Sequence, residues 1–172
     1  SDKLREWLEQ SASAYGPQSR GPRHQPLLNP EVPMFVFDAI FGLSYVFDLS
    51  KPVGERVSDL RYDGLPIANK QRFILATNHF RAAGGGGYNK MTLPAPVTKC
   101  TTTITDALEI ALHSDTCLEW MDNSPWRLKR IGTTATFDTG PAAHSCFGEI
   151  ATFAPKVLKK TGFGLDRIEI EL

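Results

Sequence analysis

Residues 74–90, which read ILATNHFRAAGGGGYNK, hold the side chains of this chain that are best suited to binding chemistry. An apolar run leads into the polar and aromatic residues from Asn78 to Arg81, and four consecutive glycines follow them. Glycine loses the most backbone freedom on folding, so such a run forms either a slack linker or a loop that approaches a ligand closely. A flexible linker would carry serine, threonine and other polar residues over a longer span. The aromatic residues Phe80 and Tyr88 on either side of the glycines favour a binding loop.

Such a loop can recognise a flat heterocycle and the groups attached to it. Successive glycine N–H groups can point at an anion or at a ribose. The Phe80 ring beside them can stack on a base, which is worth roughly 1–3 kcal/mol per base in single-stranded nucleic-acid complexes. The alternative for Phe80 is a core position beneath the loop. The glycine run matches neither the P-loop nor the dinucleotide-binding fingerprint, because the lysine of the first and the spacing of the second are absent.

The sequence shows no recognisable catalytic group. Two-metal phosphoesterases use a Gly-Asn-His-acid motif, but Asn78-His79 lacks both the glycine and the acidic residue, and no Asp-x-His pair occurs. A G-x-S-x-G motif is also absent. We expect the cysteines Cys100, Cys117 and Cys146 to be small buried residues, and their spacing leaves the existence of a disulfide open. The sequence therefore predicts a binding loop without a metal site or a nucleophile.

The overall composition limits the classes of partner. The 172 residues are 41% apolar and 22% charged, which is typical of one globular domain, and we expect residues 1–172 to form a single domain. Nineteen basic residues balance nineteen acidic ones, which argues against a nucleic-acid polymer or an anionic membrane as the partner. No apolar run approaches the roughly 18 residues of a membrane span. Because the chain opens on a charged amphipathic segment without Met, we expect a fragment of a longer protein.

The spacing of apolar residues predicts the elements that must position this loop. Helices are expected at residues 2–14, 105–121 and 141–153. Strands are expected at residues 34–50, 56–67, 71–77, 126–131, 134–139 and 165–172. Residues 34–50 are predicted to form two strands that are joined or bent at Gly42, the second segment turns at Asp63-Gly64, and Thr105 or Asp106 caps the second helix. Because strands occur in clusters with few clean βαβ units, the predicted fold is α+β or mixed α/β.

Four short motifs, taken together, resemble the C-terminal domain of the 5′-nucleotidase family. These motifs lie at residues 48–52 (DLSKP), 54–57 (GERV), 64–67 (GLPI) and 76–85 (ATNHFRAAGG), and the helix LREWLEQSA precedes them. The segments DNSPWRL, FDTGPA and TGFGLDRIEIEL resemble the end of the bacterial 2′,3′-cyclic-nucleotide 2′-phosphodiesterase/3′-nucleotidases. The resemblance therefore extends over most of the chain and implies a 5′-nucleotidase C-terminal-domain fold that is truncated at its N-terminus.

The resemblance implies a two-domain hydrolase and a role for each residue of the loop. In that family an N-terminal metallophosphoesterase domain holds two divalent metal ions, and the C-terminal domain binds the nucleoside and rotates to deliver it. The aromatic residue of the ATNHF motif, here Phe80, stacks on the base. Asn78 and the turn formed by Gly84 and Gly85 lie beside the sugar. Arg81 faces either phosphate or solvent.

One departure from the family pattern favours the cyclic-nucleotide branch. The 5′-nucleotidases place an aspartate after the Gly-Gly pair to hold the ribose hydroxyls, whereas this chain has Gly86 there. A 2′,3′-cyclic phosphate has no free ribose diol, so the loss of that carboxylate suits the cyclic and 3′-nucleotide substrates.

Further expectations concern the parts that the resemblance places outside this chain. The metal ligands and a second base-stacking aromatic residue lie upstream of the opening helix in the family. We therefore expect no cofactor in the fragment, no hydrolysis by it alone, a nucleotide or nucleoside as ligand, and the N-terminal domain of the same protein as partner. The resemblance implies a periplasmic or secreted location. The alternatives are a 5′-nucleotidase-type hydrolase domain, a nucleoside-binding module without catalysis, or a structural domain with a tight glycine turn.

Overall fold

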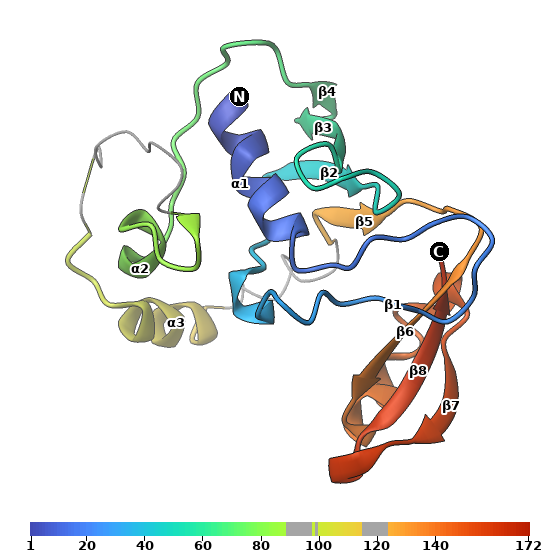
Figure 1. Cartoon of the computed structure of the whole chain (residues 1–172). Coiled ribbons are helices and arrows are strands. Elements are labelled where there is room, and N and C mark those ends of the chain that lie inside the picture. The colour runs from blue at the N-terminus through green and yellow to red at the C-terminus, as the bar shows by residue number, and fades with distance from the viewer. Residues whose placement is uncertain (89–97, 99, 115–123) are drawn as a thin grey trace.

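The N-terminal helix α1, Asp2–Ala12, forms where the sequence predicts it and packs against the first of two small β-sheets (Figure 1). The computed structural model describes residues 1–88, 98, 100–114 and 124–172. Leu4, Trp7, Leu8 and Ala12 recur at helical spacing and therefore share one face of α1, and all of them are buried. This face supplies a large part of the hydrophobic core.

The first sheet has the strand order β4-β3-β2-β5. Its strands are β2 (Leu43–Phe47), β3 (Val57–Tyr62), β4 (Leu65–Pro66) and β5 (Trp126–Leu128). β3 and β4 form the expected hairpin, and its turn residues Asp63 and Gly64 have φ values of 52° and 74°. Positive φ at both central residues is the geometry of a type I′ turn, which explains the preference for Asp-Gly. β5 pairs with β2 in parallel and so returns a distant part of the chain to this sheet.

A buried carboxylate and a buried guanidinium join α1 to the start of β3. The Glu9 carboxylate accepts hydrogen bonds from the backbone N–H groups of Gly54, Arg56 and Val57 at 2.6–3.0 Å. The Arg56 guanidinium donates to the backbone carbonyl of Ala12 at the end of the helix at 2.8 Å. The GERV motif therefore has a structural role. Its backbone N–H groups and its arginine side chain form hydrogen bonds with α1 and so hold the helix against the first sheet.

The second sheet has the strand order β1-β6-β8-β7 and lies beside the first (Figure 1). Its strands are β1 (Gln25–Pro26), β6 (Thr134–Thr139), β7 (Lys156–Lys160) and β8 (Asp166–Glu171). Ile168, Ile170 and Leu172 at the end of the chain are buried, as predicted, and Glu169 between them is buried as well. β7 was not predicted, because this lysine-rich edge strand is exposed along its whole length and carries no alternating pattern.

The predicted strand at residues 71–77 and the first half of the one predicted at 34–50 are wrong, whereas the second half of the latter forms β2. Residues 34–42 contain the 3-10 turn η1 (Met34–Val36), and the buried residues Val36 and Ile40 are four positions apart rather than alternating. Residues 71–77 form no strand, and Ile74 is 87% exposed. Apolar content misled the prediction in this segment, because no neighbouring strand pairs with its backbone.

The remaining helices are shorter than the sequence suggested. α3 spans Ile104–Leu112, and its N-cap is Thr103, which forms a capping box with Asp106. The expected helix at 141–153 is replaced by the 3-10 turns η4 (Pro141–Cys146) and η5 (Ala151–Phe153), and a third turn, η6 (Gly162–Gly164), joins β7 to β8. The rest of the helix predicted at 105–121 lies outside the described residues. None of the helices in the described ranges has the length and apolar character to cross a membrane.

The cysteines differ from the expectation of buried residues. Cys100 and Cys146 are exposed free thiols. Cys117 lies outside the residues that the structure describes. The described residues form helices and two mixed sheets, which confirms the predicted α+β or mixed α/β fold.

Candidate functional site

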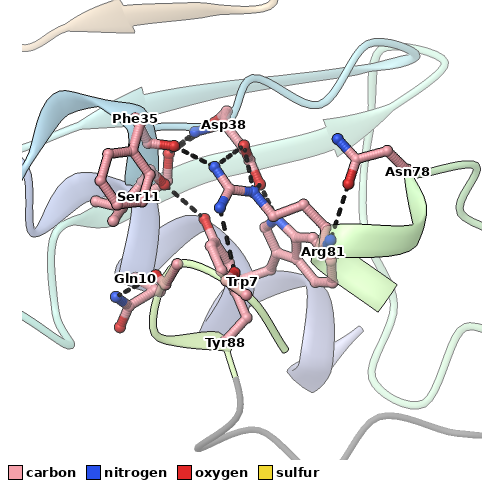
Figure 2. A network of polar contacts seen from close by, with 11 residues as sticks. Trp7, Gln10, Ser11, Phe35, Asp38, Asn78, Arg81 and Tyr88 are labelled. Carbon is pink, nitrogen blue, oxygen red and sulfur yellow. Dashed lines mark hydrogen bonds and ion pairs between the residues drawn. The ribbon is translucent and has the colours of Figure 1, made fainter. Parts of the chain in front are cut away.

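The loop of residues 78–88 begins with the short helix α2, His79–Ala82, which Asn78 caps. The side-chain oxygen of Asn78 accepts the backbone N–H of Arg81 at 2.8 Å (Figure 2). Asparagine is a preferred N-cap residue because its side chain satisfies a backbone donor that the helix leaves unpaired. Asn78 therefore shapes the loop locally, through contacts within the loop.

The glycines that follow are needed where the loop doubles back beneath its own side chains. The Phe80 ring lies across Gly85, so that a Cβ atom there would overlap the ring carbons. Gly86 has a φ of 77°, and a Cβ atom at this position would collide with the Arg81 guanidinium. Gly84 and Gly87 also have positive φ values, which glycine adopts without steric cost. The glycine run is thus a tight, contact-rich loop, unlike a slack linker.

Phe80 is 55% exposed, so the alternative of a core position for this ring is wrong. One side of the ring rests on Gly85, and the Cζ atom of Arg81 lies 5.5 Å from the ring centroid. More than half of the side chain remains accessible to solvent. The geometry leaves an aromatic surface available for a planar ligand.

The alternative that Arg81 faces solvent is wrong, because its guanidinium is buried in an ion pair. The residue is 6% exposed and its guanidinium pairs with Asp38 (Figure 2). The Nε atom lies 3.0 and 2.9 Å from the two carboxylate oxygens, and Nη2 lies 2.9 Å from Oδ1. Arg81 also donates to the backbone carbonyls of Phe35 and Gly85. Its side chain ties the loop to residues 35–38.

Asp38 is in turn fixed to helix α1. The indole N–H of Trp7 donates to its Oδ2 atom at 2.9 Å. The Ser11 hydroxyl accepts the backbone N–H of Asp38 at 2.6 Å and donates to its backbone carbonyl at 2.7 Å. Trp7 and Ser11 are four residues apart and so lie on one face of α1. Figure 2 shows these side chains converging on the ion pair from the helix side.

Tyr88 closes the other end of the loop. Its side chain is fully buried, its ring centroid lies 4.6 Å from that of Trp7, and its hydroxyl donates to the backbone carbonyl of Val36 at 2.9 Å. Burial raises the pKa of Tyr88, and the nearby Asp38 carboxylate acts in the same direction. Tyr88 is therefore a neutral hydrogen-bond donor that anchors the loop.

Sequence reasoning identified the loop but missed the residues that hold it. The sequence predicts Trp7 and Ser11 as part of an amphipathic helix, and Asp38 as part of a strand. The local signal for these residues was that each is a polar residue among apolar neighbours. Ser11 lies on the apolar face of the helix, and Asp38 lies inside an apolar run.

The chemistry that this site supports is recognition by stacking and by backbone groups. Residues 78–88 contain no acidic side chain. In the ranges that the structure describes, no three His, Cys, Asp or Glu side chains gather in a way that could hold a metal ion.

The fold and the loop define a mixed α/β structure in which a glycine-rich loop is bonded, through Arg81 and Asp38, to the N-terminal helix. The family model described as "5'-nucleotidase, C-terminal domain" matches residues 2–93, which is more than half of the 172 residues. The chain belongs to this family. The match includes α1, the first sheet up to β4 and the glycine loop, and it confirms the resemblance drawn from the motifs.

Curated relatives of this chain are bacterial nucleotide phosphoesterases. The trifunctional nucleotide phosphoesterase protein YfkN of Bacillus subtilis (strain 168) is 34% identical over 105 residues, which cover 52% of this chain and 7% of that protein. The 2′,3′-cyclic-nucleotide 2′-phosphodiesterase/3′-nucleotidase of Haemophilus influenzae is 38% identical over 99 residues, covering 48% of this chain and 15% of that protein. The chain thus spans a small part of the length of either relative.

A solved structure with a similar fold supports the same family. It is titled "Putative 5'-Nucleotidase from Staphylococcus aureus in complex with alpha-ketoglutarate", and it is 26% identical with a TM-score of 0.60. The similarity covers 74% of this chain and 25% of that one. The fold of the described residues therefore agrees with the predicted 5′-nucleotidase C-terminal-domain fold.

Proposed function

We propose that residues 1–172 form the substrate-binding domain of a 2′,3′-cyclic-nucleotide 2′-phosphodiesterase/3′-nucleotidase and that Phe80 stacks on the base of the substrate. The observation that carries this proposal is the half-exposed Phe80 ring above Gly85, in a loop whose other side is fixed to α1. An aromatic ring that is held in place binds a planar ligand at a lower entropic cost than a mobile ring.

The charge of the loop supports the cyclic-nucleotide and 3′-nucleotide branch. A carboxylate suits a vicinal diol, because it accepts hydrogen bonds from both hydroxyl groups, but it repels a phosphate. Residues 78–88 contain no carboxylate, the Arg81 guanidinium is paired with Asp38, and position 86 is a glycine. A substrate with phosphate at its 2′ and 3′ oxygens is therefore tolerated beside Asn78 and Gly84–Gly86. The name of the Haemophilus influenzae relative points to the same substrate class.

The catalytic step belongs, in this proposal, to an N-terminal metallophosphoesterase domain of the same protein. That domain would hold two divalent metal ions and supply a metal-activated water. The 172-residue chain by itself hydrolyses nothing, and the whole protein works in the periplasm or outside the cell. Turnover of 2′,3′-cAMP or 3′-AMP by the purified chain with Mn²⁺ or Co²⁺ would contradict this division of labour.

Calorimetric titration of the 172-residue chain with adenosine, 3′-AMP and 2′,3′-cAMP tests the binding proposal. We expect Phe80→Ala to weaken binding roughly 5- to 150-fold, which corresponds to the loss of one base–aromatic stack. Phe163→Ala is the matched control, because Phe163 is also exposed but lies at the turn between β7 and β8. Absence of nucleoside binding, or equal affinity of wild type and Phe80→Ala, would overturn the proposal.

A further inference from the structure

We infer that Asp38 is the positioning residue of this site, because its carboxylate fixes Arg81 and thereby holds Phe80 and the glycine loop in the orientation that receives a base. The inference rests on the proposed function, since it takes Phe80 as the group that contacts the ligand. It extends that function to a residue far from the loop in the sequence, with no predicted role in binding.

The first step is that Asp38 itself is held rigidly. Both its side chain and its backbone are bonded to α1, through the indole of Trp7 and the hydroxyl of Ser11, at 2.6–2.9 Å. α1 is independently fixed to the first sheet by Glu9, which accepts hydrogen bonds from three backbone N–H groups near the start of β3. The carboxylate of Asp38 is thus a fixed point of the scaffold.

The second step is that Arg81 transmits this position to the loop. Its Nε and Nη2 atoms engage the Asp38 carboxylate in a two-point ion pair, which sets the direction of the guanidinium plane as well as its place. A third nitrogen, Nη1, donates to the carbonyl of Gly85 at 3.2 Å. The guanidinium therefore links the scaffold to the glycine on which Phe80 rests.

The third step is that the guanidinium lies over both aromatic rings of the loop, the exposed Phe80 and the buried Tyr88. Its Cζ atom lies 5.5 Å from the Phe80 ring centroid and 5.0 Å from that of Tyr88. It also occupies the space into which a side chain at position 86 would project. Moving the guanidinium therefore displaces the support of the aromatic ring and removes the constraint on the glycines together.

The test is Asp38→Asn in the 172-residue chain. Asparagine keeps the size of the side chain and an oxygen acceptor for Trp7, but it removes the charge that pairs with Arg81. We expect faster amide hydrogen exchange at Gly84–Gly87 without ligand, and about tenfold weaker binding of 3′-AMP, as for the loss of a charge-assisted hydrogen bond. The matched control is Asp48→Asn, which removes the carboxylate of the Asp48–Lys129 ion pair and leaves the loop untouched.

A second variant separates positioning from general stability. If Asp38 acts through Phe80, then adding Asp38→Asn to Phe80→Ala weakens binding no further, whereas a general loss of folded protein would add to the effect. Additive losses would overturn the inference, as would exchange rates at Gly84–Gly87 that equal those of wild type. Failure of Phe80→Ala to alter binding contradicts the proposed function instead. The exchange rates without ligand then still report whether Asp38 orders the loop.

Discussion

Two buried arginines, Arg56 and Arg81, perform different tasks in this molecule. Arg56 is 2% exposed and donates to backbone carbonyls at the end of α1, next to Glu9, which accepts backbone N–H groups from residues 54–57. Arg81 is nearly as buried, but its partner is the Asp38 carboxylate, and its neighbour Phe80 is half-exposed. The first arrangement completes the hydrogen bonding of rigid elements. The Arg81–Asp38 pair orients a loop. We therefore expect loss of the contacts around Arg56 and Glu9 to lower the stability of the fold, and loss of the Arg81–Asp38 pair to weaken ligand binding.

The largest effect is expected for Glu9→Ala at the rigid junction. This change removes the acceptor of three backbone N–H groups, and those of Arg56 and Val57 are buried, so the free energy of unfolding should fall by about 3 kcal/mol. Urea denaturation measures this loss. Glu6→Ala on the exposed side of the same helix is the control, because its surface ion pair with Lys3 contributes at most about 1 kcal/mol. Equal losses of unfolding free energy in the two variants would show that the hydrogen bonds of Glu9 contribute no more than a surface ion pair.

An intermediate effect is expected for Gly86→Ala in the loop. A methyl group there collides with the Arg81 guanidinium, and alanine is strained at a φ of 77°, so the loop should be destabilised by about 2 kcal/mol and nucleoside binding weakened. Denaturation and calorimetric titration measure the two consequences. Gly140→Ala is the control, because a Cβ atom at this position meets open space and its φ of -67° suits alanine. Wild-type affinity in Gly86→Ala would show that the ring does not depend on the guanidinium.

The smallest effect is a pH dependence at Asp48, which belongs to the rigid part. Burial raises the pKa of this carboxyl, but hydrogen bonds from Lys129 and Ser50 outweigh it and hold the pKa below its usual value of 3.8. A carboxyl with a lowered pKa in the folded state contributes stability above its usual pKa and loses it as the pH falls through the lowered value. Asp48→Asn should therefore flatten the acid limb of the stability curve below about pH 4. An unchanged limb would show that the pair with Lys129 contributes nothing.

The local patterns in the sequence were sufficient for the elements that pair with their neighbours. The apolar face of α1, the Asp63-Gly64 turn and the existence of strand β8 each follow from contacts within a few residues or from a fixed period. Residues 71–77 show the limit of this reasoning, because an apolar run predicts a strand only where another strand offers hydrogen bonds. The prediction could not include that condition.

In the candidate site, too, the local features could be predicted and the contacts between distant residues could not. The glycine run and Phe80 were identified from residue types alone, because four glycines beside an aromatic residue are unusual in any chain. The contacts of Asp38 with Trp7 and Arg81 join residues that are 31 and 43 positions apart. No periodic pattern spans such separations. The burial of Arg81 therefore could not be predicted from the sequence.

The most direct test of the account is the observation of a nucleoside in contact with Phe80. Nuclear Overhauser effects between adenine protons and the phenyl protons of this residue, measured in a complex of the 172-residue chain with 3′-AMP, are the predicted result. Contacts of the adenine confined to other exposed aromatic residues, such as Phe41, would contradict the central claim.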